Sequence, residues 1–218
     1  MKKIAMLVAM NMEAAKLISR MEGLRHEKTA GRKFLCGKIG QAEVVMYICG
    51  MGLRRAAIGA RALVESYQPD MLVNYGVSGG LVPGLGVGDT VVVTSSCPAS
   101  GKAYRTESAV PMDEGIAKFA AQVLPDARVA PAATSIGLIL NKRRKARLVA
   151  KTGAVCIDME SYAAAKTARA LDTPLLVIRC MSDTLEPESL LHFFKNGDMA
   201  AEKVGAETET VIKKLAEA

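Results

Sequence analysis

Two apolar segments that end in acidic residues place the strongest constraint on how this chain folds. Residues 154–161 read AVCIDMES and residues 174–183 read PLLVIRCMSD. Apolar runs of this length are typical of strands buried in a parallel sheet. Ligands of open α/β sheets bind beyond the carboxyl ends of such strands. Asp158, Glu160 and Asp183 are therefore expected beside a ligand, although Asp183 could instead cap a helix and Glu160 could pair with a helix dipole.

Strands and helices are predicted to alternate along the whole chain. The predicted strands cover residues 3–9, 33–36, 42–48, 71–75, 89–94, 129–136, 154–157 and 175–181. The predicted helices cover residues 13–21, 53–67, 113–124, 142–151, 159–171 and 200–216, and residues 95–111 are expected to be irregular. This alternation predicts an α/β fold with a mostly parallel twisted sheet and helices on both faces.

The length and composition favour one domain over residues 1–218. Half of the residues are hydrophobic, but only 4% are aromatic, so aliphatic side chains and Met must form the core. No apolar run is long enough to span a membrane. Lys2 and Lys3 precede an apolar stretch as in a signal peptide, but Glu13 follows too soon. We therefore expect a cytoplasmic protein.

The cysteines and histidines argue against disulfides and against a metal site. The five cysteines are odd in number and form no CxxC pair, which favours reduced thiols. His26 and His192 have no metal-ligand spacing to another ligand type. No GxSxG segment is present to support a serine nucleophile. We therefore expect no metal ion.

The net charge of +7 arises partly from the basic run 142–147, which reads KRRKAR. The simplest interpretation is the solvated face of a helix that begins after Asn141. A nucleic-acid surface is disfavoured, because no aromatic residues lie nearby to stack on bases. Contact with an acidic membrane surface or with an anionic substrate stays open.

Two glycine clusters follow predicted strands, at Gly50-Met51-Gly52 and at residues 76–80. Glycines at such points let a backbone approach a ligand closely, although each cluster alone is better explained by a tight turn. The first cluster could bind an anion at the following helix N-terminus. Neither cluster has the GxGxxG pattern of dinucleotide sites or the Lys-Ser/Thr of a P-loop.

As a set, these motifs resemble the nucleoside phosphorylase superfamily, and within it the methylthioadenosine/S-adenosylhomocysteine nucleosidase branch. The resemblance covers nearly the whole chain, and it rests on residues 8–13, 50–52, 74–81, 87–89, 158–160 and 179–183. It implies cleavage of the N-glycosidic bond of a 5′-modified adenine nucleoside, with release of adenine. It also implies a homodimer and no cofactor, with inorganic phosphate as an alternative co-substrate.

The resemblance also implies roles for individual residues. The catalytic pair would be Glu13, which holds or activates the attacking water, and Asp183, which hydrogen-bonds the purine at N7 and at its exocyclic amine. The implied substrate-binding residues are Met51, Ser78, Gly79, Met159, Glu160 and Arg179. These types suit the chemistry, because a buried carboxyl can stay protonated and carboxylates stabilise an oxocarbenium-like sugar.

Two departures from the family pattern bear on the substrate. Val77 stands where the family often has a nucleophile-contacting serine, and the serine comes one step later at Ser78. Residues 95–111 are short and carry one aromatic residue, Tyr104. A short version of this region is similar to the hopanoid-associated branch, which acts on the lipid adenosylhopane. A lipid-linked substrate and a non-catalytic nucleoside-binding protein of the same fold are therefore the alternatives.

Overall fold

A computed structural model describes residues 2–99, 108–137, 139, 141–184 and 189–218 of the chain, the side chains of 189–194 excepted. The strands are β1 (Lys3–Val8), β2 (Glu22–Thr29), β3 (Arg32–Ile39), β4 (Ala42–Ile48), β5 (Met71–Gly80), β6 (Thr90–Pro98), β7 (Val110–Pro111), β8 (Arg128–Thr134), β9 (Cys156–Asp158) and β10 (Leu175–Asp183). The helices are α1 (Asn11–Ile18), α2 (Leu53–Tyr67), α3 (Glu114–Val123), α4 (Lys142–Thr152), α5 (Ser161–Ala170) and α6 (Ser189–Glu217).

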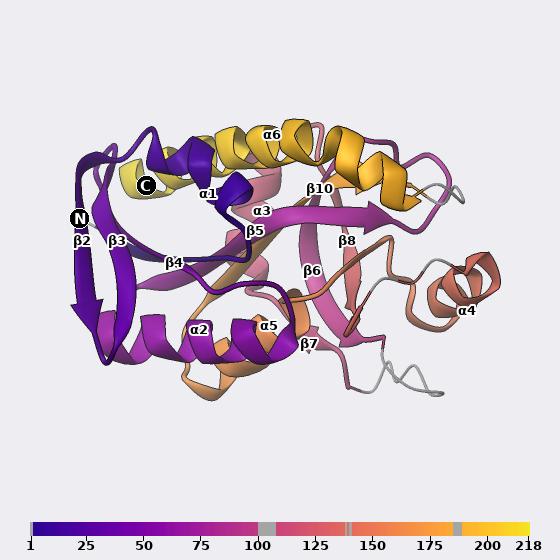
Figure 1. Cartoon of the computed structure of the whole chain (residues 1–218), viewed down its shortest axis with the longest axis horizontal. Helices are drawn as coiled ribbons and strands as arrows, with labels where there is room; N and C mark the ends of the chain where they lie inside the picture. Colours follow the sequence, from indigo (N-terminus) through magenta and orange to yellow (C-terminus); the bar gives the residue numbers. More distant parts are fainter. Residues whose placement is uncertain (1, 100–107, 138, 140, 185–188) are drawn as a thin grey trace.

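A single sheet separates two layers of helices (Figure 1). Helices α1, α3 and α6 cover one face, and α2 and α5 cover the other. Strand β1 shows why the sheet is apolar on both sides. Ala5 and Leu7 pack into the α2–α5 layer, whereas Ile4 and Met6 pack into the α1–α6 layer. This two-sided burial explains the continuous apolar runs of the sequence.

The predicted α/β fold with a central sheet flanked by helices is confirmed. The strand order is β10-β6-β8-β9-β5-β1-β4-β3-β2, with β7 beside β6. The pairs β4–β1–β5–β10 and β6–β8–β9 are parallel. Antiparallel pairs accompany this parallel part: β2–β3–β4 form hairpins, β6 runs antiparallel to β10, and β9 runs antiparallel to β5. The parallel part places the ends of β1, β5 and β10 at one edge.

The glycine-rich segment after position 75 is strand, so the strand predicted to end at residue 75 is too short and the interpretation of residues 76–80 as a tight turn is wrong. Strand β5 continues through Gly80, where it pairs with β10 on one side and with β9 on the other. The missing side chains leave space for acidic groups from other elements, and the ladder pairing supplies the strand's stability. A run of glycines reads as a turn in sequence, because the pairing partners lie far away along the chain.

Three further boundaries differ from the sequence prediction. Strand β6 continues to Pro98, so residues 95–98 are not irregular. Tyr104 lies outside the described residues. Strand β2 was not predicted, because its residues are almost all exposed and show no alternation of apolar and polar types. Helix α6 begins at Ser189 rather than at residue 200.

The remaining expectations concern thiols and membrane spans. All five cysteines are free thiols, and all but Cys49 are buried. In the part of the chain that the structure describes, none of the helices has the length and apolar character needed to cross a bilayer.

Candidate active site

A pocket of about 450 Å³ opens where β1, β5, β9 and β10 end. Its walls bring together Glu13, Met51, Ser78, Gly79, Met159, Glu160 and Asp183, which are seven of the eight predicted site residues. The eighth, Arg179, is 1% exposed and is not part of the pocket lining. Asp158, which the sequence also placed beside a ligand, and Val77 line the pocket too. Lining residues that the sequence did not single out are Ala9, Met10, Gly137, Ile157 and Ser182. Of these five, Ser182 directly precedes the predicted residue Asp183 in sequence.

Glu13 is held at one end of the pocket by two backbone N–H groups. It is the third residue of α1, and its Oε2 accepts a hydrogen bond from Met10 N at 2.8 Å. Its Oε1 accepts from Val77 N at 2.9 Å. Gly76 makes this position available, since a Cβ there would collide with Glu13 Oε1. Burial raises the pKa of Glu13 despite these donors.

Glu160 lies two residues after the end of β9, directly before α5, and is 6% exposed. Its Oε1 accepts a hydrogen bond from Gly52 N at 2.8 Å, and its Oε2 accepts from Met159 N at 3.2 Å. Gly52 has φ 106°, a conformation that favours glycine. Burial raises the pKa of Glu160 to about 7, although Arg179 opposes this. The glycine cluster at 50–52 therefore positions the Glu160 carboxyl. The Gly52 N–H, which was a candidate donor to an anionic ligand, donates to Glu160 instead.

Asp183 closes the pocket at the end of β10. Ser182 Oγ donates to its Oδ1 at 3.0 Å. Its Oδ2 lies only 3.0 Å from where a Cβ on Gly79 would be. The carboxyl is therefore packed against bare β5 backbone. A larger residue at position 79 would displace it.

Arg179 and Asp158 form a buried support beneath the acidic groups. Arg179 Nε donates to Asp158 Oδ2 at 2.7 Å, and its Nη2 donates to Asn74 Oδ1 and to Ser161 Oγ. Asp158 Oδ1 also accepts from Thr134 Oγ1 at 2.7 Å. Burial pushes the pKa of Asp158 upward, but the Arg179 charge and the hydroxyl donors outweigh it and hold the pKa below its usual range. Asp158 therefore stays ionised.

The pocket offers carboxyl groups in contrasting protonation states. Glu13 and Glu160 have raised pKa values, whereas Asp158 is held ionised. Groups of this kind can hold a proton, polarise water and bond to sugar hydroxyls. Within residues 2–99, 108–137, 139, 141–184 and 189–218, no group of three or more His, Cys, Asp or Glu side chains is placed to hold a metal ion.

Comparison with known proteins shows which proteins this chain resembles. The profile of the Phosphorylase superfamily matches residues 3–214. The 5′-methylthioadenosine/S-adenosylhomocysteine nucleosidase of Chromohalobacter salexigens is 30% identical, over 99% of this chain and 98% of that protein. The Streptococcus pneumoniae nucleosidase of the same name, solved with a transition-state inhibitor, superposes with a TM-score of 0.91 at 24% identity, over 98% and 99% of the two chains. A futalosine hydrolase of Helicobacter pylori superposes with a TM-score of 0.90 at 17% identity, over 98% and 100%.

Proposed function

The chain belongs to the Phosphorylase superfamily, and from this membership and the pocket we propose that it cleaves the N-glycosidic bond of a 5′-modified adenine nucleoside and releases adenine. The observation that carries the proposal is the convergence of Glu13, Glu160 and Asp183 in one pocket of about 450 Å³. Relatives named 5′-methylthioadenosine/S-adenosylhomocysteine nucleosidase support the substrate class. The presence of all three carboxyl groups disfavours a protein that only binds nucleosides, because binding alone does not require groups that can donate or accept protons.

Each carboxyl has a distinct proposed role. Asp183 gives its proton to N7 of the purine while the bond between C1′ and N9 breaks and its electron pair moves into the base. Glu160 accepts hydrogen bonds from the ribose hydroxyls and stabilises the cationic sugar. Glu13 holds a water molecule, accepts one of its protons and lets its oxygen bond to C1′. Met51, Met159 and the backbone of Ser78 and Gly79 pack around the nucleoside.

Hydrolysis is the proposed reaction, with phosphorolysis as the alternative. A phosphate ion would need hydrogen-bond donors and positive charge at this end of the pocket, but the Glu13 carboxyl lies there. The Val77 N–H group already donates to Glu13. The Ser78 hydroxyl donates to Ile157 O at 2.8 Å, and the Arg179 guanidinium is bound to Asp158, Asn74 and Ser161. These donors are engaged within the protein, which disfavours a site for a phosphate dianion.

The test is incubation of the protein with methylthioadenosine, S-adenosylhomocysteine and adenosine, with and without phosphate. Chromatography should detect free adenine together with a free 5′-substituted ribose. A ribose 1-phosphate formed only with phosphate would establish phosphorolysis. Tight binding of all three nucleosides without adenine release would establish a non-catalytic binding protein.

A lipid-linked adenosine is the second candidate substrate, and exposed apolar residues beside the pocket favour it. Met51 in the pocket wall is 52% exposed, and Ile136, which precedes the wall residue Gly137, is 71% exposed. An apolar mouth of this kind suits a bulky apolar 5′-substituent. The exposed basic residues Lys142 and Arg143 could contact an acidic membrane surface. A long-chain 5′-alkyl adenosine should then compete at least as well as methylthioadenosine; its exclusion would assign the protein to small substrates.

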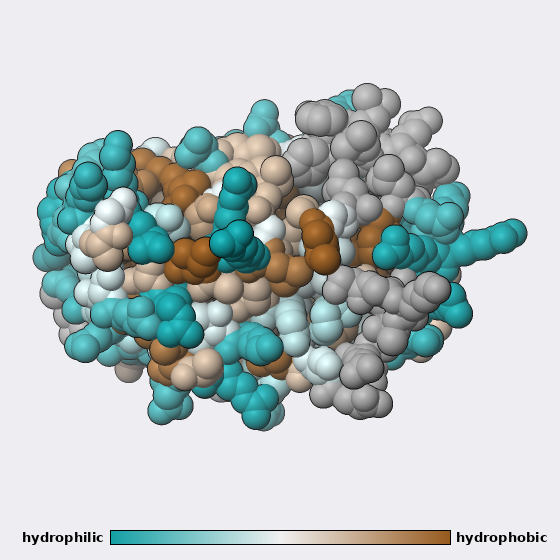
Figure 2. Space-filling model, turned by 60° about the horizontal axis from the view of Figure 1, so that its bottom comes forward, coloured by the Kyte–Doolittle hydropathy of each residue, from teal (hydrophilic) through white to brown (hydrophobic). Residues whose placement is uncertain are grey.

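We also propose a cytoplasmic homodimer. Figure 2 shows apolar side chains among charged ones on the face that carries α2. On this face Ile58 is 41% exposed and borders a groove of about 280 Å³, together with Ala57 and Arg61. Light scattering should give twice the chain mass, and Ile58→Glu should shift the protein toward the monomer if this face is the interface.

A further inference from the structure

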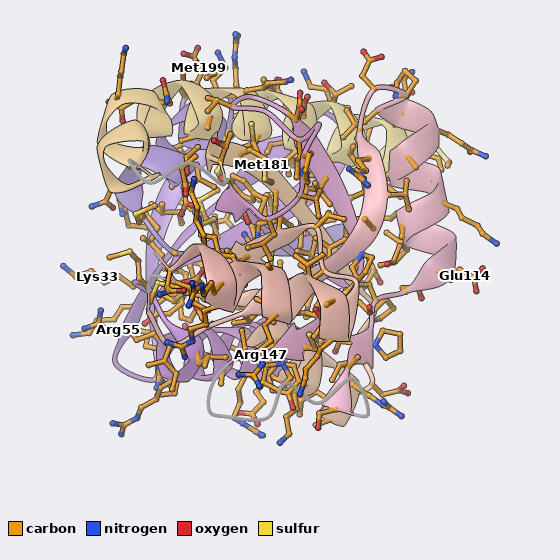
Figure 3. The ribbon with its side chains drawn as sticks, turned by 90° about the vertical axis from the view of Figure 1, so that its right-hand side faces the viewer. Lys33, Arg55, Glu114, Arg147, Met181 and Met199 are labelled. Atoms are coloured by element: carbon orange, nitrogen blue, oxygen red, sulfur yellow. The ribbon has the colours of Figure 1, made fainter. Side chains whose placement is uncertain are left out.

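Lys145 differs from the rest of the basic run because its side chain is buried. It is 2% exposed, whereas Lys142, Arg143 and Arg147 on the same helix are exposed. Figure 3 faces α4 and places Arg147 on the side of the helix away from Met181 of β10. Burial of an ammonium group costs free energy unless a partner compensates. The solvated helix face predicted for residues 142–147 therefore does not describe this lysine.

Lys145 is directed at the end of β10, behind the pocket wall. Its Nζ donates to Thr184 O at 3.2 Å. Thr184 follows Asp183, and neither Lys145 nor Thr184 lines the pocket. The Lys145 pKa is lowered by burial, and the charge of Asp183 partly opposes this. The ammonium group is therefore close enough to Asp183 to act on it electrostatically, without touching a bound nucleoside.

Helix α4, which carries Lys145, is anchored by an N-terminal cap and by a buried leucine. The Asn141 side chain caps the helix by accepting from Arg144 N at 3.1 Å. Leu148, one turn after Lys145, is fully buried in a cluster with Leu81 and Ala154. The helix is therefore anchored on both sides of the lysine. Such anchoring holds the Lys145 ammonium group at a defined position.

Among the described residues, the other charged groups around the pocket come from different elements. They are Glu13 on α1, Asp158 on β9, Glu160 after β9 and Arg179 on β10. Arg179 is bound to Asp158, and it influences the pKa values of Glu13 and Glu160. Lys145 reaches the end of β10 from α4, and Asp183 is the acid that acts on its pKa.

We propose that Lys145 is a positioning residue that strengthens Asp183 as the acid for the leaving base. It holds the Asp183–Thr184 backbone through Thr184 O, and its charge stabilises the carboxylate that remains once Asp183 has given its proton to the purine. This proposal rests on the proposed function. A carboxylate formed beside an ammonium group is lower in energy, so proton transfer at the transition state becomes easier.

Three substitutions separate the charge from the hydrogen bond. Lys145→Met removes both, Lys145→Gln keeps an N–H donor for Thr184 O without the charge, and Lys145→Arg keeps the charge. Arg143→Met is the matched control, because it removes one exposed positive charge from the same helix. Should Lys145→Met fail to fold, the glutamine variant decides the question by itself.

The primary readout does not depend on turnover. Carboxyl carbon NMR, with Asp183 assigned from Asp183→Asn, follows the pH at which Asp183 loses its proton. Lys145→Met and Lys145→Gln should raise that pH by about one unit, which is at the low end of the shift caused by loss of a nearby opposite charge. Lys145→Arg and Arg143→Met should leave that pH unchanged. An unchanged Asp183 titration in Lys145→Gln overturns the proposal. Absence of adenine release by the wild-type protein would overturn the proposed function while leaving this readout intact.

The kinetic readout then links the charge to the reaction. Lys145→Gln should lower kcat about tenfold and move the descending alkaline limb of its pH profile to higher pH. In an Asp183→Asn background the same substitution should have no further effect on kcat, because the residue acts through Asp183. A full additional loss in that background would show a role independent of Asp183 and overturn the proposal.

Discussion

Arg179 on β10 and Asp158 at the end of β9 form a buried ion pair, with 2.7 Å between Arg179 Nε and Asp158 Oδ2. The two side chains are 2% and 0% exposed. Asn74 and Ser161 take up a further guanidinium donor, so β5, β9, β10 and α5 are joined at one point beneath the pocket. This network fixes the strand ends that carry Glu160 and Asp183.

Arg179→Met should lower the free energy of unfolding by about 3–5 kcal/mol, because it leaves Asp158 charged and buried without its partner. Urea denaturation of the purified variant measures the change. The matched control is Arg61→Met, whose exposed pair with Glu65 should contribute less than about 1 kcal/mol. The double variant Arg179→Met/Asp158→Asn should be less destabilised than Arg179→Met alone. Equal stability of Arg179→Met and wild type would contradict this account of the network.

Asp183→Asn should keep the fold but reduce the rate of adenine release by about 100-fold or more, the scale for loss of a general acid. Asparagine has nearly the same shape, so the packing on Gly79 is retained. Asp113→Asn is the control, because Asp113 caps α3 at a distance from the pocket. Near-normal turnover by a properly folded Asp183→Asn protein would remove Asp183 from the mechanism.

Glu13→Gln should lower kcat with little change in KM, because Glu13 is proposed to act on the water rather than on the nucleoside. Gly76→Ala should give a similar loss, since its added Cβ would displace the Glu13 carboxyl. The control is Gly86→Ala, where the nearest atom would be Asp89 Oδ2 at an ordinary 3.6 Å. Full activity of Gly76→Ala would show that the held position of Glu13 is not required.

Glu160 should make both binding and stability depend on pH around neutrality. Its pKa rises from the ordinary 4.5 in the unfolded chain to about 7 in the folded protein. The folded state therefore binds this proton more strongly, so the group's contribution to stability is complete below pH 4.5 and is lost as the pH rises through about 7. Substrate binding should change in the opposite direction, because the ionised form accepts hydrogen bonds from the ribose hydroxyls.

Glu160→Gln removes this titration and provides the comparison. Between pH 5 and pH 8, roughly the window in which such shifts act, wild-type stability in urea should fall relative to that of Glu160→Gln. KM should rise in the variant and lose its dependence on pH. Parallel stability curves for the two proteins would mean that Glu160 does not titrate in this range.

Local pattern was enough to predict the fold class, and the resemblance to the nucleoside phosphorylase superfamily supplied most residues of the candidate pocket. The apolar runs at 154–157 and 175–181 reflect buried strands, as expected. Strand β9 runs antiparallel to β5 whereas β10 runs parallel to it, so the acidic ends of β9 and β10 meet because both strands pair with the glycine-rich end of β5. Seven of the eight site residues that the resemblance implied line one pocket. Their catalytic and binding roles stay predictions, tested by the substitutions above.

Contacts between distant segments were decided only by the tertiary structure. Gly52 donates to a carboxyl 108 residues away, and Lys145 donates to a carbonyl 39 residues away. From the sequence alone, Gly52 was interpreted as part of a possible anion site, and Lys145 as part of an exposed basic helix face. The hydrophobic periodicity of a sequence indicates which side of a helix or strand is apolar. Whether a polar group contacts water, a ligand or another protein group depends on how the helices and strands pack together. The same packing turned the glycines after Tyr75 into a strand, because β9 and β10 supply the pairing on either side.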